Sequence, residues 1–301
     1  MIKGLACSDL NSLKYIIIFE NGRLGNQLFQ YLAARTAAPR AQIVCIGLQS
    51  LLVTFQPSAQ HLADTKRGSL LKKLFSRLGR NRALNLAKNR KIWSVISEIR
   101  DEDHTFVMLT QGLFKKIALL DGFFQDEVIF EKFSCEQFPL RIELLESARE
   151  WIEANVISRG LIPYFLHLRR GDYVRWPTSD HPAVLPLQWY KQQMNEIARA
   201  DKRAHFVVCT DDRPYAEEML GSNPMVSIFG GLEIDDFFLM TQCSGGGILS
   251  ASTFSWWAAW YGKHFFHCSR YIAPKYWAGW RLREWYPPAI ETTWLEYRDV
   301  N

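Results

Sequence analysis

From about residue 161 onward, short apolar runs alternate regularly with helical patterns, and this rhythm constrains the fold more than any other feature of the chain. The apolar runs predict strands at 164–168, 205–209, 226–229, 247–250 and 263–267. The helical patterns between them lie at 186–200, 213–220, 233–243 and 253–261. Strands and helices that alternate at this spacing predict a parallel, doubly wound α/β sheet. Ligands of such a sheet bind just beyond the carboxyl ends of its strands.

The N-terminal part of the chain predicts a second α/β region. Lys14–Glu20 is an apolar, β-branched run that predicts a strand. The turn Asn21–Arg23 follows it and leads into the helical pattern LGNQLFQYLAAR. Further strands are predicted at 42–46 and around 105–108.

Length and pattern together predict two domains. A chain of 301 residues, of which 48% are hydrophobic, can fill two cores of ordinary size. The helical pattern ELLESAREWIEAN gives way to Ser158-Arg159-Gly160, which marks the boundary. We therefore expect domains at 1–157 and 158–301, with the aromatic tail from Tyr271 onward packing back across the cleft between them.

The heptad from His167 to Tyr173, HLRRGDY, sets two arginines, a glycine and an acid directly after a predicted strand. The planar fork of arginine binds two phosphate oxygens together. Neighbouring side chains on an extended backbone point in opposite directions, so one arginine can reach a ligand while a carboxylate such as Asp172 holds the other. We predict that Arg169 binds phosphate and that Arg170 lies beside it. The alternative is a solvated Arg-Arg-Asp ion pair at a strand end.

A second candidate for phosphate binding is Gly22-Arg23-Leu24-Gly25-Asn26-Gln27, which follows the first predicted strand and opens a helix. Free backbone N–H groups and the helix dipole attract anions at such a position. Gly22, Gly25 and Asn26 are therefore candidate contacts. The alternative is a tight turn, because the spacing of these glycines is not the G-x-G-x-x-G of dinucleotide-binding loops.

Two further polar clusters follow predicted strands of the C-terminal sheet. Asp211 and Asp212 come after HFVVC, where a carboxylate can accept hydrogen bonds from a purine or a ribose, or can cap the next helix. Ser252, Thr253 and Ser255 come just before or within the start of the helix SWWAAWYG. Their hydroxyl groups can hold phosphate, or can cap that helix.

The sequence predicts no metal site. Asp101-Glu102-Asp103 is a D-x-D-like carboxylate pair, but it lies in the charged run SEIRDEDH, which predicts a solvated turn. The histidines show no metal-ligand spacing. For His167 we expect a hydrogen-bonded position in the core, with general-base catalysis as the alternative.

The net charge of +5 is unevenly distributed, because Lys66–Lys91 contains ten Lys or Arg residues and no acid. Its apolar helical face, flanked by basic residues, can dock on anionic lipid. The alternative is a solvated basic helix that covers its own domain. Base-stacking aromatics are sparse in this stretch, so no binding of nucleic acid is expected.

The chain carries no signal for export or for a membrane span. No apolar run approaches the roughly 18 to 20 residues that cross a bilayer, and the first residues lack the apolar stretch of a signal peptide. The six cysteines include no C-x-x-C pair, which is typical of reduced thiols. We expect a cytoplasmic protein in peripheral contact with the inner face of the membrane through Lys66–Lys91.

Taken together, these segments resemble the bacterial α-1,2-fucosyltransferases of glycosyltransferase family 11. The resemblance rests on GRLGNQLFQYLAAR from Gly22, HLRRGDY from His167, TDD from Thr210 and DDFFLMTQC…ILSASTFSWWAAWYG from Asp235. It covers nearly the full length, and the combination of HxRRGDY with STFSWWAAW is specific. The eleven tryptophans agree with it, because aromatic faces pack on sugar rings.

The resemblance implies an α/β, GT-B-like fold, with two Rossmann-like domains facing a central cleft, an N-terminal acceptor side and a C-terminal donor side. The implied donor is GDP-β-L-fucose, no cofactor or metal is required, and fucose passes with inversion to O2 of a terminal galactose in a glycan. Arg169 is expected on the donor diphosphate, with an acid at Asp211 or Asp212 toward guanosine. The other implied contacts around the phosphates are Asn26, Ser252, Thr253 and Ser255.

The resemblance leaves the general base open among His167, Asp172 and an acid of the N-terminal half. The chain departs from many family members at Ser244–Gly247 and at Ser250-Ala251, where those members carry His-Asn and Asn, so we expect a donor or acceptor contact of those members to be missing there. Another GDP-sugar transferase and a non-catalytic nucleotide or glycan binder are the alternative functions.

Overall fold

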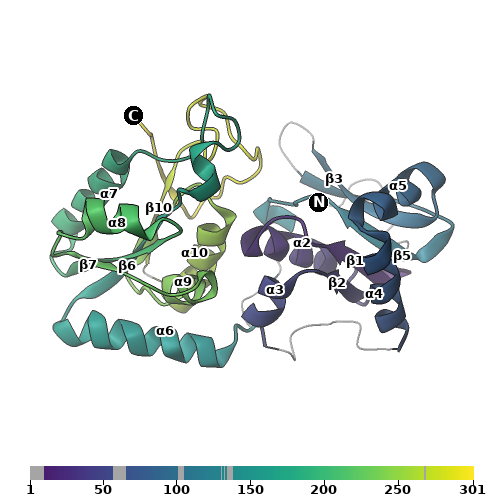
Figure 1. The fold of residues 1–301 in the computed structure, drawn as a ribbon, viewed down its shortest axis with the longest axis horizontal. Coiled ribbons are helices and arrows are strands. Elements are labelled where there is room, and N and C mark those ends of the chain that lie inside the picture. The colour runs from purple at the N-terminus through teal and green to yellow at the C-terminus, as the bar shows by residue number, and fades with distance from the viewer. Residues whose placement is uncertain are drawn as a thin grey trace. The chain divides into compact units, whose positions relative to one another are not determined.

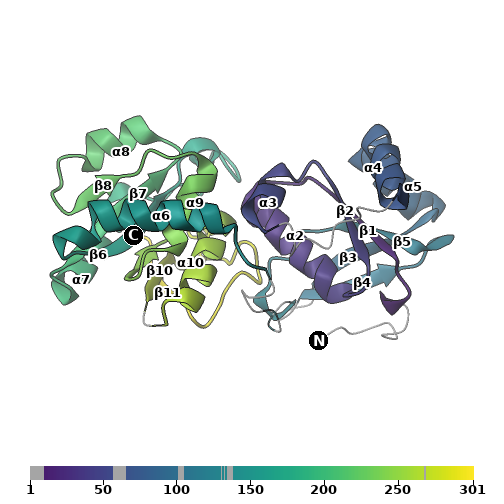
Figure 2. The ribbon, with the colours of Figure 1, turned by 90° about the horizontal axis from the view of Figure 1, so that it is seen from below.

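The structure is a computed structural model that describes residues 10–56, 66–100, 105–129, 131, 133, 138–267 and 269–301. The chain forms two compact units, Met1–Pro139 and Leu140–Asn301. In each unit helices cover a central β-sheet, as Figure 1 and Figure 2 show from two directions.

The described helices and strands of the first unit are β1 (Tyr15–Phe19), α2 (Leu24–Ala37), β2 (Gln42–Ile46), α3 (Gln49–Thr54), α4 (Lys66–Leu78), α5 (Arg80–Arg90), β3 (Trp93–Arg100), β4 (Thr105–Thr110), β5 (Phe114–Asp121) and the 3₁₀ turn η2 (Glu127–Ile129).

Five strands form the sheet of the first unit, in the order β2-β1-β5-β3-β4. Neighbouring strands run parallel except β3 and β4, which pair antiparallel at one edge. The strands predicted at 42–46 and 105–108 are confirmed as β2 and β4. β3 and β5 carry no clear apolar run, because β3 interleaves polar residues and β5 opens on three exposed residues before its buried centre.

Helix α4 covers this sheet with one face and exposes another. Phe75 is fully buried, and its ring contacts Trp93 and Phe19 at centroid distances of 4.9 and 6.1 Å. Leu71 and Leu78 pack against the same core. Leu70 and Leu74 point away from it, with 65% and 49% of their surface exposed. The basic helix therefore covers its own unit and also presents leucines to solvent.

The helices and strands of the second unit are α6 (Ile142–Asn155), η4 (Ile157–Arg159), β6 (Ile162–Leu168), η5 (Gly171–Val174), α7 (Leu187–Ala200), β7 (Ala204–Thr210), α8 (Arg213–Leu220), β8 (Val226–Ile228), α9 (Glu233–Thr241), β9 (Gly246–Ile248), α10 (Thr253–Phe265), β10 (Arg270–Pro274) and β11 (Glu296–Arg298).

The sheet of the second unit has the order β11-β10-β9-β6-β7-β8, and every neighbouring pair is parallel. From β6 the chain proceeds to β7 and β8 on one side and then returns to β9 on the other side. β6 and β9 are therefore the topological switch point, where ligands of open α/β sheets bind. The predicted doubly wound sheet is confirmed, and so is the α/β class with two units built on largely parallel sheets.

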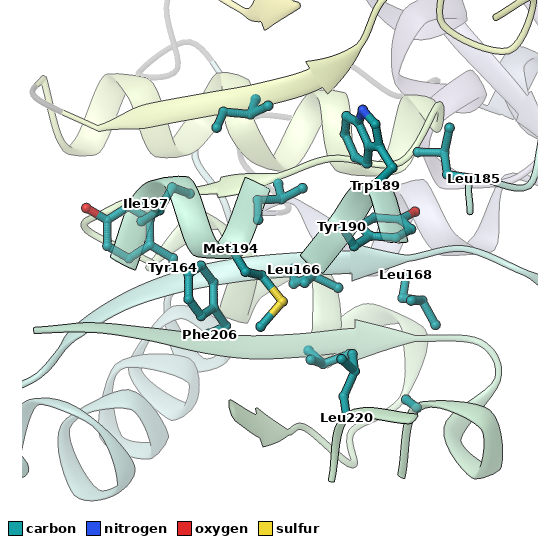
Figure 3. Packing of buried hydrophobic residues seen from close by; sticks show 14 of the residues in the cluster. Tyr164, Leu166, Leu168, Leu185, Trp189, Tyr190, Met194, Ile197, Phe206 and Leu220 are labelled. Carbon is teal, nitrogen blue, oxygen red and sulfur yellow. The ribbon is translucent and has the colours of Figure 1, made fainter. Parts of the chain in front are cut away.

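One hydrophobic core of the second unit lies between its sheet and α7 (Figure 3). Leu166 and Leu168 of β6 and Phe206 of β7 pack with Tyr190 and Met194 of α7. All five are at least 98% buried. This packing fixes the direction in which β6 ends, which matters because the heptad begins on that strand.

Two details of the second unit differ from the prediction. The strand predicted at 263–267 is wrong, because α10 continues to Phe265 and the strand follows at Arg270–Pro274. The central part of α10 is buried on all sides, so no polar face marks where it ends. Helix α6 packs against α9 and belongs to the second unit, so the compact units divide at Pro139 rather than near residue 157.

The tail from Tyr271 onward packs on the second unit. Its strand β11 extends the sheet beside β10. The indole N–H of Trp189 on α7 donates to the backbone oxygen of Asp299 over 3.1 Å. Arg270 and Arg298 both pair with Glu196 of α7. These contacts anchor the C-terminal segment to α7.

The substitution Phe75→Ala should lower the free energy of unfolding by about 3–5 kcal/mol, because it removes a fully buried ring and leaves a cavity. The neighbouring Leu74→Ala should change it by about 0.5 kcal/mol or less, because Leu74 is half exposed. Urea unfolding followed by tryptophan fluorescence measures both variants. Equal losses would contradict the division of α4 into a buried and an exposed face.

Candidate functional site

The polar residues predicted in the C-terminal half meet at the carboxyl edge of the second sheet. Leu168 of β6 pairs in register with Thr210 of β7, so Arg169 and Asp211 leave adjacent strand ends side by side. β9 is the other neighbour of β6. A serine-rich loop, residues 249–252, follows β9 and leads into α10. The sheet topology therefore brings three separate sequence segments to the switch point.

Arg169 is held between two carboxylates. Its Nη1 lies 2.9 Å from Asp211 Oδ2, and its Nη2 lies 2.5 Å from Asp172 Oδ1. The guanidinium group also lies 5.3 Å from the centre of the Tyr173 ring. Only 11% of the Arg169 side chain is exposed, whereas 59% of the Asp172 side chain is. Arg169 is thus fixed on its inner side by Asp211 and covered on its outer side by an accessible carboxylate.

Arg170 has different partners. Its backbone N–H donates to Asp211 Oδ1 over 2.8 Å, and its Nε donates to Asp212 Oδ2 over 2.9 Å. Its guanidinium group lies 3.6 Å from the centre of the Tyr215 ring, a cation–π contact. The prediction that Asp172 holds the second arginine is therefore wrong, because Asp172 pairs with Arg169 and Asp212 takes Arg170.

Asp211 and Asp212 each pair with an arginine of the heptad. Asp212 also caps α8, since its Oδ1 accepts a hydrogen bond from the backbone N–H of Tyr215 over 3.3 Å. The capping alternative for Asp212 is thus confirmed together with its ion pair. The Asp211 carboxylate lies directly over Gly171, where a Cβ atom would collide with it. The glycine of the heptad allows Asp211 to reach both arginines.

His167 lies in the core beneath the arginines. It is 5% exposed, its Nδ1 lies 2.7 Å from Ser250 Oγ, and its ring packs near Phe254. Burial, with a smaller effect of the Arg169 charge, lowers the pKa of His167 to about 3. The imidazole is therefore neutral near pH 7, and its hydrogen bond ties β6 to the loop after β9.

The serine-rich loop is held largely by its own hydroxyl groups. Ser252 caps α10, because its Oγ accepts the backbone N–H of Phe254 over 3.3 Å. Ser255 Oγ is fully buried and donates to the carbonyl oxygens of Ser250 and Ser252. Thr253 begins the helix and is partly buried. The capping alternative is confirmed for Ser252, and the Ser255 hydroxyl serves the loop itself.

Tyr173, the last residue of the heptad, joins the two strand ends. Its hydroxyl donates to the carbonyl oxygen of Ala251 over 2.9 Å. Burial is the main reason that the pKa of Tyr173 rises to about 12, so the hydroxyl keeps its proton. This contact fixes the loop after β9 relative to Arg169.

Packing explains the glycines where the chain departs from the family pattern. Gly246 has a φ of +107°, and a Cβ atom there would collide with the carbonyl group of Arg270 on the next strand. A Cβ atom on Gly247 would meet the ring of Phe165. In this chain β9 can pair with β10 and pack on Phe165 only with glycine at these two positions.

The candidate residues of the N-terminal half lie in the first unit. Gly22 has a φ of +85°, and the side chain of Asn26 packs over it. Asn26 Oδ1 accepts a hydrogen bond from Gln125 over 2.8 Å, and Gln27 donates to the carbonyl oxygen of Gly22. Gly25 is buried in the first turn of α2. The tight turn is confirmed, and contact of these residues with a ligand stays a prediction.

A family model for glycosyl transferase family 11 matches residues 90–277, more than half of the chain and parts of both units. The chain belongs to glycosyl transferase family 11.

A glycosyltransferase and several fucosyltransferases align with part of this family 11 chain. It is 29% identical over 167 residues to the O-antigen biosynthesis glycosyltransferase WbnK of Escherichia coli, which covers 52% of this chain and 54% of WbnK. It is 30% identical over 132 residues to the galactoside 2-alpha-L-fucosyltransferase SEC1 of Bos taurus, which covers 41% of this chain and 36% of SEC1. The alignments thus span about half or less of these relatives.

Solved structures of similar fold have low sequence identity. The fucosyltransferase NodZ from Bradyrhizobium is 14% identical, with a TM-score of 0.47 over 82% of this chain and 92% of NodZ. POFUT1 in complex with GDP-fucose is 14% identical, with a TM-score of 0.49 over 86% of this chain and 97% of POFUT1.

Among the residues that the structure describes, no three His, Cys, Asp or Glu side chains are grouped so that they could hold a metal ion. Asp101-Glu102-Asp103 lies outside the described residues. Of the described helices, none is long and apolar enough to cross a membrane.

The site of this family 11 chain includes aromatic residues that no motif indicates by itself. Tyr215 lies under Arg170, and Trp176 stacks on Tyr173 with ring centres 5.0 Å apart. Tyr286 of the tail contacts Trp176 at 5.8 Å. Trp176 and Tyr286 are far apart in the sequence, so only the folded tail brings them together beside the heptad.

Asp236 on α9 is a further buried acid near the site. It is 9% exposed, and burial, followed by the charge of Asp235, raises the pKa of Asp236 to about 8. The carboxyl group is therefore mostly protonated at neutral pH. It lies in the DDFF segment that contributes to the resemblance, but its sequence alone does not distinguish it from the neighbouring surface acid.

The buried, neutral His167 should make stability depend on pH. The unfolded chain binds a proton on this residue below about pH 6.5, whereas the folded chain resists protonation down to about pH 3. Acidification between these values should therefore lower the free energy of unfolding by about 1.4 kcal/mol for each pH unit.

The variant His167→Asn can still bond Ser250 but has no imidazole to protonate. The difference in its free energy of unfolding from wild type should therefore shrink from pH 7 to pH 5. Urea unfolding at both pH values measures it; a constant deficit would contradict the buried neutral imidazole.

Proposed function

We propose that this chain is an inverting α-1,2-fucosyltransferase that moves L-fucose from GDP-β-L-fucose to O2 of a terminal galactose in a glycan. The observation that carries the proposal is the Arg169–Arg170 pair at the switch point of a parallel sheet, held by Asp211 and Asp212. Two of the curated relatives support the reaction, because SEC1 and the Sus scrofa galactoside alpha-(1,2)-fucosyltransferase 2 bear it in their names.

Arg169 is the proposed ligand of the donor diphosphate. Asp172 must first leave the Arg169 guanidinium group, and because 59% of the Asp172 side chain is exposed, water can solvate the released carboxylate. Two phosphate oxygens can then take the outer face of the planar fork, while Asp211 keeps its inner side. As the bond from fucose C1 to the phosphate oxygen breaks, the leaving GDP gains negative charge, which Arg169 stabilises.

Asp172 is the favoured general base among the three candidates. Once diphosphate displaces it from Arg169, its carboxylate is free to accept the proton of the galactose O2 hydroxyl. That oxygen then attacks fucose C1 from the face opposite GDP, which gives the inverted, α-linked product. His167 is disfavoured because it is buried and bonded to Ser250, and an acid of the first unit stays an alternative.

The remaining candidate residues divide into those proposed to lie near the phosphates and those proposed to support the loop or to position Arg169. Ser252 and Thr253, at the start of α10, and Gly22, Gly25 and Asn26, at the start of α2, keep their proposed role near the phosphates. The Ser255 hydroxyl supports the loop instead. Arg170, Asp211 and Asp212 are proposed to position Arg169, with the guanosine contact of the two acids secondary to their ion pairs.

The variant Arg169→Lys keeps the charge but loses the planar fork, so kcat should fall about 100-fold or more while the protein stays folded. The control Arg213→Lys changes an exposed arginine that pairs with Glu217 in its own helix and should remain within twofold. GDP release from GDP-fucose with lactose measures both. Turnover of Arg169→Lys within tenfold of wild type would overturn the assignment.

The reaction itself is tested by incubating the chain with GDP-fucose, excess EDTA and a panel of galactosides, followed by linkage analysis. The expected product is an α-1,2-fucosylated galactoside, formed at full rate in EDTA because arginines supply the positive charge. Transfer from another GDP-sugar in a parallel panel would support the alternative donor. Binding of GDP without release of GDP on addition of lactose would support a non-catalytic binder.

We also propose that α4 brings the chain into peripheral contact with an anionic membrane. Leu70, Lys73, Leu74 and Arg77 follow one another at helical spacing on the solvent side of α4, and all four are exposed. Leucines among basic side chains suit insertion at the boundary between anionic headgroups and acyl chains. The adjoining α5 adds further basic residues and no acid.

The double variant Leu70→Ala/Leu74→Ala should reduce sedimentation with phosphatidylglycerol vesicles at least threefold, because the inserted apolar area is lost. The control Leu232→Ala removes a leucine of the second unit that is more exposed than either, and should have no effect. Wild-type binding should weaken at high salt and should be absent on phosphatidylcholine vesicles. Equal binding of wild type to both lipids would refute the contact, and so would equal binding of the double variant and wild type to phosphatidylglycerol.

A further inference from the structure

The first unit contains a cavity, wide open to solvent, that no motif of the sequence indicates. Its volume is about 350 Å³, in the range of small-molecule sites. It is lined by residues from four separate segments: Asn21, Arg80, Glu98, Asp121, Gly122 and Phe123. None of them belongs to the donor site proposed above.

The cavity lies at the carboxyl edge of the first sheet. Asn21 follows β1, Gly122 and Phe123 follow β5, and Glu98 lies near the end of β3. These three strands are parallel neighbours with β5 in the centre. The chain passes from β1 to β2 on one side and later adds β5 and β3 on the other, so this edge is a topological switch point. Ligands of open α/β sheets bind at such positions.

One wall of the cavity presents an aromatic ring on a fixed loop. Glu98 Oε2 accepts hydrogen bonds from the backbone N–H groups of Phe123 and Phe124, over 2.9 and 2.6 Å. Phe124 adopts a left-handed φ of +56° and is fully buried, whereas 37% of Phe123 is exposed. The loop therefore turns one phenylalanine into the core and holds the other toward the cavity, where it can pack on the apolar face of a sugar ring.

Charged side chains also line the cavity. Asp121 pairs with Arg80 over 3.0 Å and with Lys88 over 2.5 Å, both from α5. Of the residues that line the cavity, Asp121 and Glu98 are acidic and Arg80 is basic, so the cavity has no excess positive charge to attract a phosphate. Carboxylate oxygens and guanidinium N–H groups are partners for hydroxyl groups, which both donate and accept. The chemistry fits an uncharged, hydroxyl-rich ligand.

We infer that this cavity binds a pyranose unit of the acceptor glycan, with Phe123 stacked on the ring and Asp121 and Arg80 bonded to its hydroxyl groups. The inference rests on the proposed function for the identity of the sugar, a galactoside. It assigns acceptor binding to particular residues of the first unit, apart from the arginines of the second.

The test uses the full chain with GDP-fucose as donor and lactose as acceptor. Phe123→Ala should raise the KM for lactose at least fivefold, because the stacking face is lost. Phe123→Tyr, which keeps an aromatic ring, should stay within twofold of wild type. Phe114→Ala removes an exposed phenylalanine from the other end of β5 and should also stay within twofold. A KM within twofold for Phe123→Ala, or equal shifts in all three variants, would overturn the inference.

A direct binding measurement separates this inference from the proposed reaction. Calorimetry with lactose, in the presence of GDP, should give at least fivefold weaker binding for Phe123→Ala than for wild type. If that holds while no fucose is transferred, the cavity is a sugar site and the proposed reaction fails. If fucose is transferred but lactose binds wild type and Phe123→Ala equally, or does not bind at all, the reaction stands and the cavity assignment fails.

Discussion

The ion pair between Arg169 and Asp211 joins the ends of two neighbouring parallel strands, and the candidate donor site depends on it. Because β6 and β7 pair in register up to Leu168 and Thr210, the two side chains start from adjacent points on the sheet edge. Asp211 also accepts the backbone N–H of Arg170, so one carboxylate sets the path of the chain as well as the guanidinium. Gly171 leaves the space that this carboxylate needs. Removing any one of these groups leaves a charge or a backbone donor without its partner.

Much of the second unit follows from local sequence pattern. Buried parallel strands are continuous apolar runs, and helices between them show a polar face, so β6, β7 and β8 and the helices that follow could be predicted. The strand at 270–274 could not be predicted, because the central part of α10 is buried on all sides and no polar face marks where this helix ends. Which strand ends meet follows from the topology. Which acid meets which arginine depends on rotamers and turn geometry, so sequence pattern does not show that Asp172 pairs with Arg169 rather than with Arg170.

The first unit gives a weaker pattern for a physical reason. β3 and β5 have partly solvated surfaces, so neither forms an uninterrupted apolar run. The residues around the cavity come from positions 21, 80, 98 and 121–123, and each alone is an ordinary surface residue. A motif records residues that are close along the chain. A cavity built from four strand and helix ends is visible only after the sheet order is known.

Asp172 has a consequence for the end of the proposed catalytic cycle. It sits three residues from Arg169 on a short 3₁₀ turn, so after transfer it is a tethered rival of GDP for the same guanidinium group. A tethered group competes at a high effective concentration without being consumed. Once Asp172 has released the proton that it accepted from galactose, its carboxylate can return to Arg169 each time the GDP contact loosens, and this hastens the departure of GDP. Because GDP-fucose presents the same diphosphate, the carboxylate competes with the donor as well, so faster product release comes with weaker donor binding.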